Sequence, residues 1–275
     1  MGDTVVLNKK QLYYLSLSGK NSTFSLPFTT KASMHKNKLI PLFTYFVLAF
    51  GIAFSLNRWL PDMRIVSVDL TAILTGLGPL LSGLICYRLF NLPNSYRITF
   101  SGVQPVITYA VLALMALLPV LFITKVPKTV IIASIITQFL YSLGEEYGWR
   151  HYLQNLTAGT SRWVWPFVTG TLWFFWHYSL VDNPVRVLTG QNLPPLIGIP
   201  VAILFLSLFS FLWGDLTVKT KSILMPAIAH SITKFGDGMS IGIVVTILLF
   251  LQIFWYKLKL GQPKQKRDEQ MGLYN

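Results

Sequence analysis

Two neighbouring carboxylates followed by a basic side chain are the residues of this sequence best suited to chemistry. Glu145, Glu146 and Arg150 stand in the stretch YSLGEEYGWRHYLQ, at the end of an almost wholly apolar run. On a helix, Glu146 and Arg150 lie four residues apart on one face, in the order that favours an ion pair. Glu145 points about 100° away from Glu146, so it has no counterion on its own helix. We predict that Gly144 and Gly148 let a neighbouring helix or a substrate backbone approach closely.

Two histidines lie in other apolar runs. His177 is found in TLWFFWHYSL and His230 in TKSILMPAIAHSITKF, and the whole chain has only four histidines. At a helical rise of 1.5 Å per residue, Glu145 and His230 each lie about 12–13 Å inside the cytoplasmic ends of their predicted spans. We therefore expect Glu145, His177 and His230 to meet in one cavity that faces the cytoplasm.

This set of residues predicts hydrolysis by an activated water. A desolvated carboxylate is an effective general base, and a histidine can stabilise the oxyanion that forms when water attacks a carbonyl. The alternative is a catalytic zinc ion held by Glu145, His177 and His230 with an open fourth position. Because the helical H-E-x-x-H pattern is absent, we favour a site without a metal or other cofactor.

The composition indicates a membrane protein. Of the 275 residues, 53% are hydrophobic and 12% are charged, against about 25% charged in soluble domains. The mean hydropathy is +0.54. The net charge of +13 comes from basic residues between and beyond apolar runs, a pattern typical of membrane spans and not of nucleic-acid binding. The single cysteine, Cys86, lies inside an apolar run and excludes an internal disulfide.

Apolar runs of about 20 residues predict an all-α membrane protein, a bundle of about eight transmembrane helices. The predicted domains are a polar basic N-terminal segment (1–38), a polytopic membrane domain (39–256) with its core motifs in 145–234, and a basic C-terminal tail (257–275). The expected spans are 39–56, 65–90, 105–124, 129–148, 163–181, 196–213, 222–235 and 239–256.

The basic residues predict the orientation in the cell membrane. With eight spans, the side that holds both termini carries 17 of the 23 Lys and Arg residues. Loops rich in Lys and Arg stay on the cytoplasmic side, so both termini are expected there. Asp69 and Asp215 fall near the ends of spans, and we interpret them as interfacial and not catalytic.

The motifs on three spans resemble those of a known family, the CAAX protease and bacteriocin-processing membrane proteins (CPBP, or Abi). EEYGWRHYL is similar to the family's E-E-x-x-x-R motif, WFFWH to its F-x-x-x-H motif, and TKSILMPAIAHSITK to its H-x-x-x-N motif. The resemblance covers 145–234, with the three motifs in the family's order.

This resemblance implies an intramembrane endopeptidase with about eight helices around a conical cavity open to the cytoplasm. The water would be activated by Glu145, supported by Glu146 and Arg150, and His177 and His230 would complete the site. The implied substrate is a membrane-associated peptide or a lipidated, prenylated C-a-a-X protein, met at the membrane lipid and not on nucleic acid.

The sequence departs from the family pattern at two positions, both expected to line the site. Trp173 stands where the family has Phe, and Lys234 stands where it has the Asn that the resemblance assigns to the oxyanion. Either Lys234 rebuilds this oxyanion site, or the protein is a catalytically impaired immunity or regulatory binding protein on the same fold. A transporter with a polar relay is a further alternative, although no internal repeat supports it.

Overall fold

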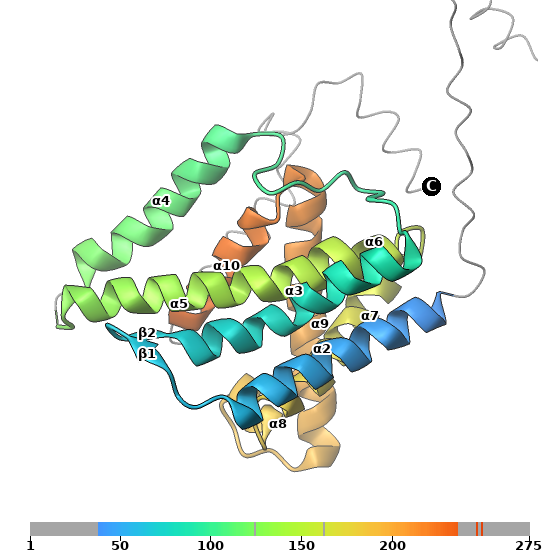
Figure 1. Cartoon of the computed structure of the whole chain (residues 1–275), viewed down its shortest axis with the longest axis horizontal. Coiled ribbons are helices and arrows are strands. Elements are labelled where there is room, and N and C mark those ends of the chain that lie inside the picture. The colour runs from blue at the N-terminus through green and yellow to red at the C-terminus, as the bar shows by residue number, and fades with distance from the viewer. Residues whose placement is uncertain (1–37, 124, 162, 236–245, 247–248, 250–275) are drawn as a thin grey trace, which may run out of the picture. The chain divides into compact units, whose positions relative to one another are not determined.

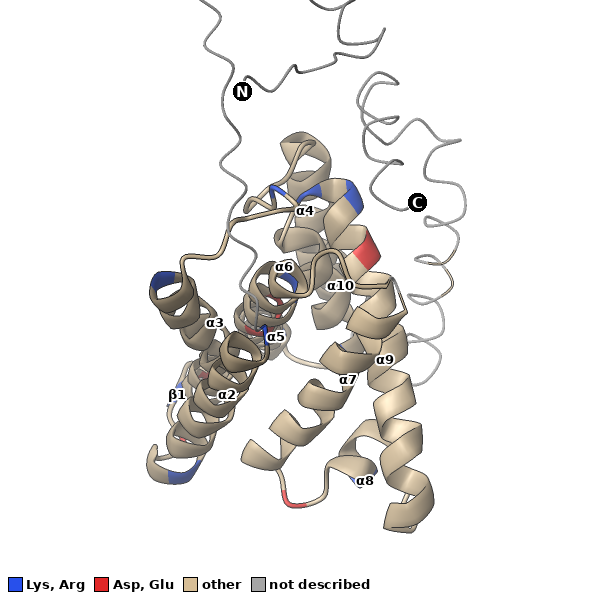
Figure 2. Ribbon diagram, turned by 90° about the vertical axis from the view of Figure 1, so that its right-hand side faces the viewer, with Lys and Arg blue, Asp and Glu red and all other residues tan. Residues whose placement is uncertain are grey.

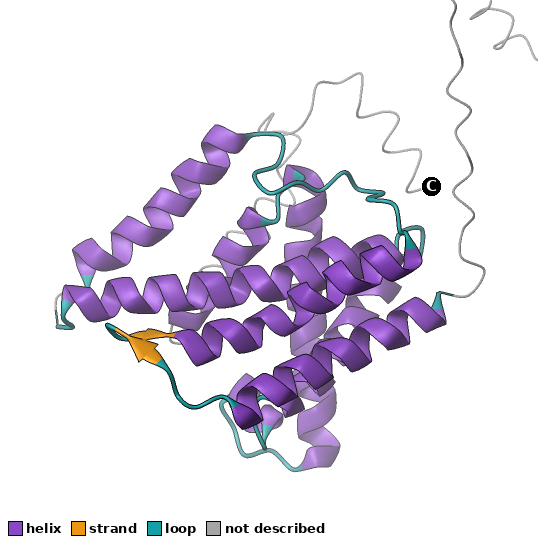
Figure 3. Cartoon of the chain, in the orientation of Figure 1, coloured by secondary structure: helices purple, strands orange, loops and turns teal. Residues whose placement is uncertain are grey.

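The computed structural model describes residues 38–123, 125–161, 163–235, 246 and 249. These residues are mostly helical (Figure 3), as the sequence predicts. The eighth expected span, 239–256, and the C-terminal tail fall almost wholly outside the described residues, as does the N-terminal segment apart from Lys38. The proposed division into three segments therefore stays a prediction.

Seven of the expected spans correspond to helices. The α-helices are α2 (Leu39–Trp59), α3 (Leu70–Phe90), α4 (Pro105–Phe122), α5 (Lys128–Glu146), α6 (Gln154–Leu156), α7 (Val164–Trp176), α8 (Pro184–Thr189), α9 (Pro195–Thr220) and α10 (Leu224–Phe235). A π-helix, η1 (Tyr147–Leu153), joins α5 to α6, and a 3₁₀ turn, η2 (His177–Ser179), follows α7. The strands β1 (Arg64–Ile65) and β2 (Val68–Asp69) form a short antiparallel hairpin.

The structure moves several of the expected helix boundaries. The second span begins at Leu70 and not at Ile65, because the preceding residues form the hairpin and the Asp69 carboxylate caps α3 by accepting from the Ala72 amide at 2.8 Å. The fifth span ends as an α-helix at Trp176, where η2 begins. Helix α9 extends to Thr220, seven residues beyond the expected end, and the short helix α8 was not predicted.

Three of the described helices, α2, α3 and α9, are long and apolar enough to cross a membrane. Large apolar side chains are exposed on their outer faces and on α4, for example Phe43, Leu84, Leu117 and Leu204. A water-soluble protein rarely exposes so much apolar surface. Figure 2 shows few charged positions along the ribbon, most of them near helix ends or in loops. These features support a membrane location.

Helix α5 lies between α3 and α10, and α7 packs against α9 (Figure 1). The contact of α3 with α5 is close because glycines face each other. A Cβ atom added at Gly144 would collide with the backbone of Gly76, and one added at Gly148 would meet the Tyr45 hydroxyl and Pro79. The predicted close helix approach is confirmed, with α3 as the partner at Gly144 and both α2 and α3 as partners at Gly148. It fixes the carboxyl-terminal end of α5, which carries both glutamates.

Candidate active site

The two glutamates lie at the junction of α5 and the π-helix η1. Glu145 and Glu146 are the last residues of α5, and Arg150 lies within η1. The amide of Gln154 donates to the Trp149 carbonyl, the i→i−5 bond of a π-helix. Such π-helical turns occur frequently at functional sites. All three charged side chains are fully buried in a chain whose outer surface is apolar.

Glu146 joins α5 to α10 through two polar contacts. Its Oε2 lies 3.2 Å from Arg150 Nε, which confirms the ion pair predicted from the spacing. Its Oε1 lies 2.9 Å from His230 Nδ1. Since an ionised carboxylate can only accept, His230 carries its proton on Nδ1. Glu146 therefore fixes both the position and the tautomer of His230.

Aromatic rings surround the remaining faces of Arg150 and His230. The Arg150 Cζ lies 5.2 Å from the ring centroid of Trp173 and 5.6 Å from that of Trp213, within range of cation–π attraction. The His230 ring stacks on Trp213 with centroids 4.7 Å apart and planes at 18°. These rings exclude water from the Glu146–Arg150 pair.

Glu145 finds partners on two other helices. Its Oε2 accepts a hydrogen bond of 2.6 Å from the Trp173 indole nitrogen on α7. Its Oε1 lies 3.8 Å from the Lys234 ammonium on α10 and has no hydrogen-bond partner among the described residues. The sequence correctly leaves Glu145 without a counterion on its own helix, because the counterion comes from α10. One oxygen of this buried carboxylate is thus without a hydrogen-bond partner among the described residues.

His177 is held by the backbone of the preceding helix, α7. Its Nδ1 lies 2.7 Å from the Trp173 carbonyl, which can only accept, so Nδ1 carries the proton. Both histidines lie near Trp173: the ring centroids of His177 and His230 are 6.0 Å and 5.4 Å from that of Trp173. In their neutral forms both imidazoles leave Nε2 as a hydrogen-bond acceptor.

The structure therefore gathers the predicted residues around the Trp173 side chain, from α5, η1, α7, η2 and α10. Sequence reasoning missed two contributors. The ring of Tyr141 lies under the Lys234 ammonium, 3.9 Å from nitrogen to centroid; its place one turn before Glu145 on α5 was a usable signal. Trp213 lies on α9, and nothing in the local sequence pattern ties it to the site.

The donor set does not fit the alternative zinc site. The described residues contain no group of three or more His, Cys, Asp or Glu side chains placed to hold a metal ion. The Lys234 ammonium lies 3.8 Å from Glu145 Oε1, where a ligand oxygen would have to face a second cation. His230 Nδ1 is already used by Glu146. We derive no step through a metal.

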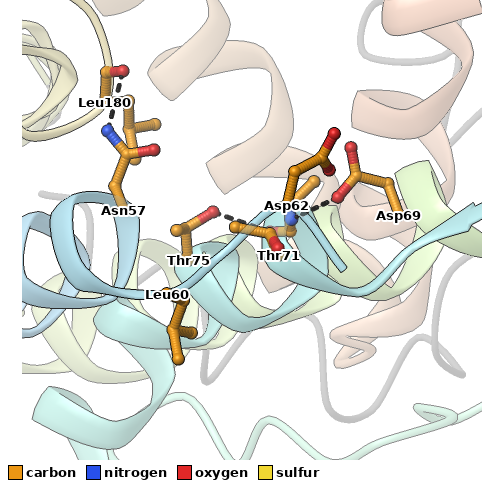
Figure 4. Close-up of a pocket in the computed structure, with 8 residues that line it drawn as sticks. Asn57, Leu60, Asp62, Asp69, Thr71, Thr75 and Leu180 are labelled. Carbon is orange, nitrogen blue, oxygen red and sulfur yellow. Dashed lines mark hydrogen bonds between the residues drawn. The ribbon is translucent and has the colours of Figure 1, made fainter. Parts of the chain in front are cut away.

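The two aspartates expected near the ends of spans, Asp69 and Asp215, have structural partners. Asp69 caps α3, and Asp215 forms an ion pair of 2.6 Å with Lys219 on the same helix. An open pocket of about 350 Å³ lies beside Asp69, between the end of α2, the start of α3 and Leu180 (Figure 4). There, Asn57 donates to the carbonyls of Ser179 and Leu180, just after His177. None of the residues that line this pocket is among the predicted catalytic residues.

Fold and site together define a helical membrane protein that buries a carboxylate–histidine cluster contributed by three helices. Residues 127–236 match the model of a family described as Type II CAAX prenyl endopeptidase Rce1-like. This match confirms the family that the three motifs indicate. The matched segment contains all seven predicted site residues, namely Glu145, Glu146, Arg150, Trp173, His177, His230 and Lys234. The comparisons with curated proteins and with solved structures gave no significant match.

Proposed function

We propose that this protein is an intramembrane endopeptidase that hydrolyses a membrane-associated peptide by means of a water activated by Glu145. The observation that carries the proposal is the environment of Glu145. Its side chain is fully buried, one oxygen is fixed by Trp173, and the other has no hydrogen-bond partner among the described residues. The match of 127–236 to a family of prenyl endopeptidases supports the same reaction class.

In the proposed reaction, water binds at Glu145 Oε1. The carboxylate takes one proton from this water, and the oxygen of the water attacks the scissile carbonyl carbon. The carbonyl oxygen becomes an oxyanion. The tetrahedral intermediate then collapses, the C–N bond breaks, and Glu145 passes the proton to the departing amine nitrogen. No side chain is acylated, so Glu145 returns to its starting state once both products leave.

In this scheme a neutral histidine orients the water. His177 and His230 both carry their proton on Nδ1, because the partners of Nδ1 are a carboxylate and a carbonyl. Nε2 of a neutral imidazole accepts a hydrogen bond and so can orient the second hydrogen of the water. The sequence led us to expect that a histidine stabilises the oxyanion. A neutral imidazole with its proton on Nδ1 has no proton on Nε2 to donate to an oxyanion. One hydrogen of the water goes to Glu145, so the second is accepted by Nε2 of one of the two imidazoles, His177 or His230.

Glu146 and Arg150 are positioning residues in this proposal. Glu146 holds His230 through Nδ1, and Arg150 compensates the charge of Glu146. The proposed substrate is a prenylated C-a-a-X peptide. It would enter a conical cavity that opens to the cytoplasm, and both termini of the protein would lie on that side. The family match and the excess of basic residues on the terminal side support this assignment.

The proposal is tested with purified protein in proteoliposomes and a synthetic farnesylated peptide that ends in a C-a-a-X sequence. Wild-type protein should cleave the peptide, and Glu145→Gln, which keeps the shape but removes the base, should lower kcat by about 10³-fold or more. Asp215→Asn is the matched control, because Asp215 pairs with Lys219 away from the cluster. Equal loss in both variants would refute the assignment of Glu145.

The second candidate is a catalytically impaired binding protein on the same fold. The Lys234 ammonium favours it, since an ion pair at 3.8 Å engages the carboxylate that would otherwise act as the base. This reading requires that the cellular function persist in a Glu145→Ala/His230→Ala double variant. Loss of that function together with loss of cleavage would exclude it.

A further inference from the structure

Both positions at which the chain departs from the family motifs contact the same carboxylate. Trp173, in place of Phe, donates to Glu145 Oε2 at 2.6 Å, and phenylalanine has no such donor. Lys234, in place of Asn, lies 3.8 Å from Oε1. The two substituted side chains come from different helices, α7 and α10. They hold one oxygen each.

We propose that Trp173 and Lys234 form a two-point clamp that positions Glu145 and compensates its charge, so that the two departures are one coupled adaptation of the active site. The inference rests on the proposed function for its catalytic part. The contacts of the clamp exist whether or not the protein cleaves peptides. Lys234 thereby becomes part of the working site and not a sign of impairment.

The charges in the cluster explain why a clamp is needed. Glu145 and Glu146 are both fully buried, and Arg150 is engaged with Glu146. Without Lys234, the cluster would carry one buried negative charge with no cation beside it. An uncompensated buried charge is strongly destabilising. Lys234 therefore balances the pair of glutamates with a second cation.

The position of Lys234 also suits a role during the reaction. Its ammonium lies over the Tyr141 ring, 3.9 Å from the nitrogen to the ring centroid. The Lys234 side chain keeps 29% of its surface accessible, whereas the Glu145 side chain keeps none. Of these two partners, only the Lys234 side chain reaches the accessible surface. A carbonyl brought to a water on Oε1 would meet this ammonium, which can donate to the oxyanion.

A stability cycle tests the clamp independently of catalysis. The thermal midpoint is measured for wild type, Lys234→Met, Glu145→Gln and the double variant, all purified in the same detergent. Lys234→Met should lower the midpoint when Glu145 is present and lower it clearly less beside Glu145→Gln, because the neutral amide needs no cation. Equal shifts in the two backgrounds would overturn the clamp.

An activity series tests the catalytic part on the farnesylated peptide. Lys234→Met and Trp173→Phe should each reduce kcat by about 10- to 100-fold with little change in KM, as for a lost hydrogen bond or ion contact to a charged group. Lys234→Arg, which keeps the positive charge, should retain most of the wild-type kcat. Trp149→Phe is the matched control, since Trp149 is also buried in this core but its indole nitrogen has no partner among the described residues.

The outcomes separate the two proposals. If wild type cleaves and Lys234→Met cleaves faster, Lys234 is an inhibitory contact and the clamp is refuted while the peptidase proposal stands. If Trp149→Phe loses as much kcat as Trp173→Phe, the loss reflects packing and the hydrogen bond has no special role. If no variant cleaves, wild type included, the peptidase proposal fails and the stability cycle still decides on the clamp.

Discussion

Removal of the Arg150 guanidinium should destabilise the protein more than loss of any exposed arginine. In Arg150→Met the side chain keeps much of its length and loses its charge. Glu146 then remains fully buried, with His230 Nδ1 at 2.9 Å as its one remaining described partner. Removing one partner of a buried ion pair lowers the free energy of unfolding by about 3–5 kcal/mol. The two lost cation–π contacts belong to the same guanidinium and are included in this figure.

The assay is equilibrium unfolding in mixed micelles, followed by tryptophan fluorescence. The free energy of unfolding should fall by about 3–5 kcal/mol in Arg150→Met. The matched control is Arg88→Met at the exposed end of α3, where a change of about 0.5 kcal/mol or less is expected. The comparison separates the buried pair from the general effect of removing a positive charge.

The double variant Arg150→Met/Glu146→Gln gives the sharper result. A glutamine amide carries no charge, and its oxygen can still accept from His230 Nδ1. The double variant should therefore be more stable than Arg150→Met alone, because two neutral groups replace one orphaned anion. The reasoning is refuted if Arg150→Met costs less than about 1 kcal/mol, or if adding Glu146→Gln lowers stability further.

Three further predictions concern packing, capping and orientation. Gly144→Ala should destabilise the protein and reduce cleavage, because the added Cβ would collide with the α3 backbone. In the control Gly51→Ala, on α2, the added Cβ meets nothing within 4 Å, so this variant should be neutral or slightly stabilising. Thermal unfolding of both variants is the measurement. Asp69→Ala should lower the free energy of unfolding by about 1 kcal/mol, and Asp69→Asn should lower it much less, since asparagine also caps a helix. A clear loss of kcat in Asp69→Asn at unchanged stability would contradict the structural role. Tags on the two termini should both be digested only when protease reaches the cytoplasmic side, and digestion of either tag from outside would show the orientation to be wrong.

The helical positions and the first ion pair could be predicted because they depend on local sequence. Apolar runs give the spans, and the four-residue spacing places Arg150 beside Glu146 even though the turn between them is π-helical. The glycine approach was also predictable, since small residues at Gly144 and Gly148 leave room for a neighbour. Each of these features needs only the helix period and side-chain size.

The partners of Glu145 could not be derived in this way. Trp173 and Lys234 lie on other helices, and their contact with Glu145 depends on how α7 and α10 cross α5. The hairpin before α3 was missed because β1 and β2 are only two residues long each, too short for an alternating pattern. Tertiary packing decides the partners of Glu145, and hydrophobic periodicity does not encode it.

The central claim is that Glu145 activates the water that cuts the peptide bond. A single-turnover reaction in H₂¹⁸O tests it most directly, with product mass measured for wild type and for Glu145→Gln on the farnesylated peptide. The account predicts one ¹⁸O atom in the new carboxyl group from wild type, no enzyme-bound peptide, and no product from Glu145→Gln. Product formation by Glu145→Gln at a comparable rate, or a covalent peptide–enzyme adduct in wild type, would contradict it.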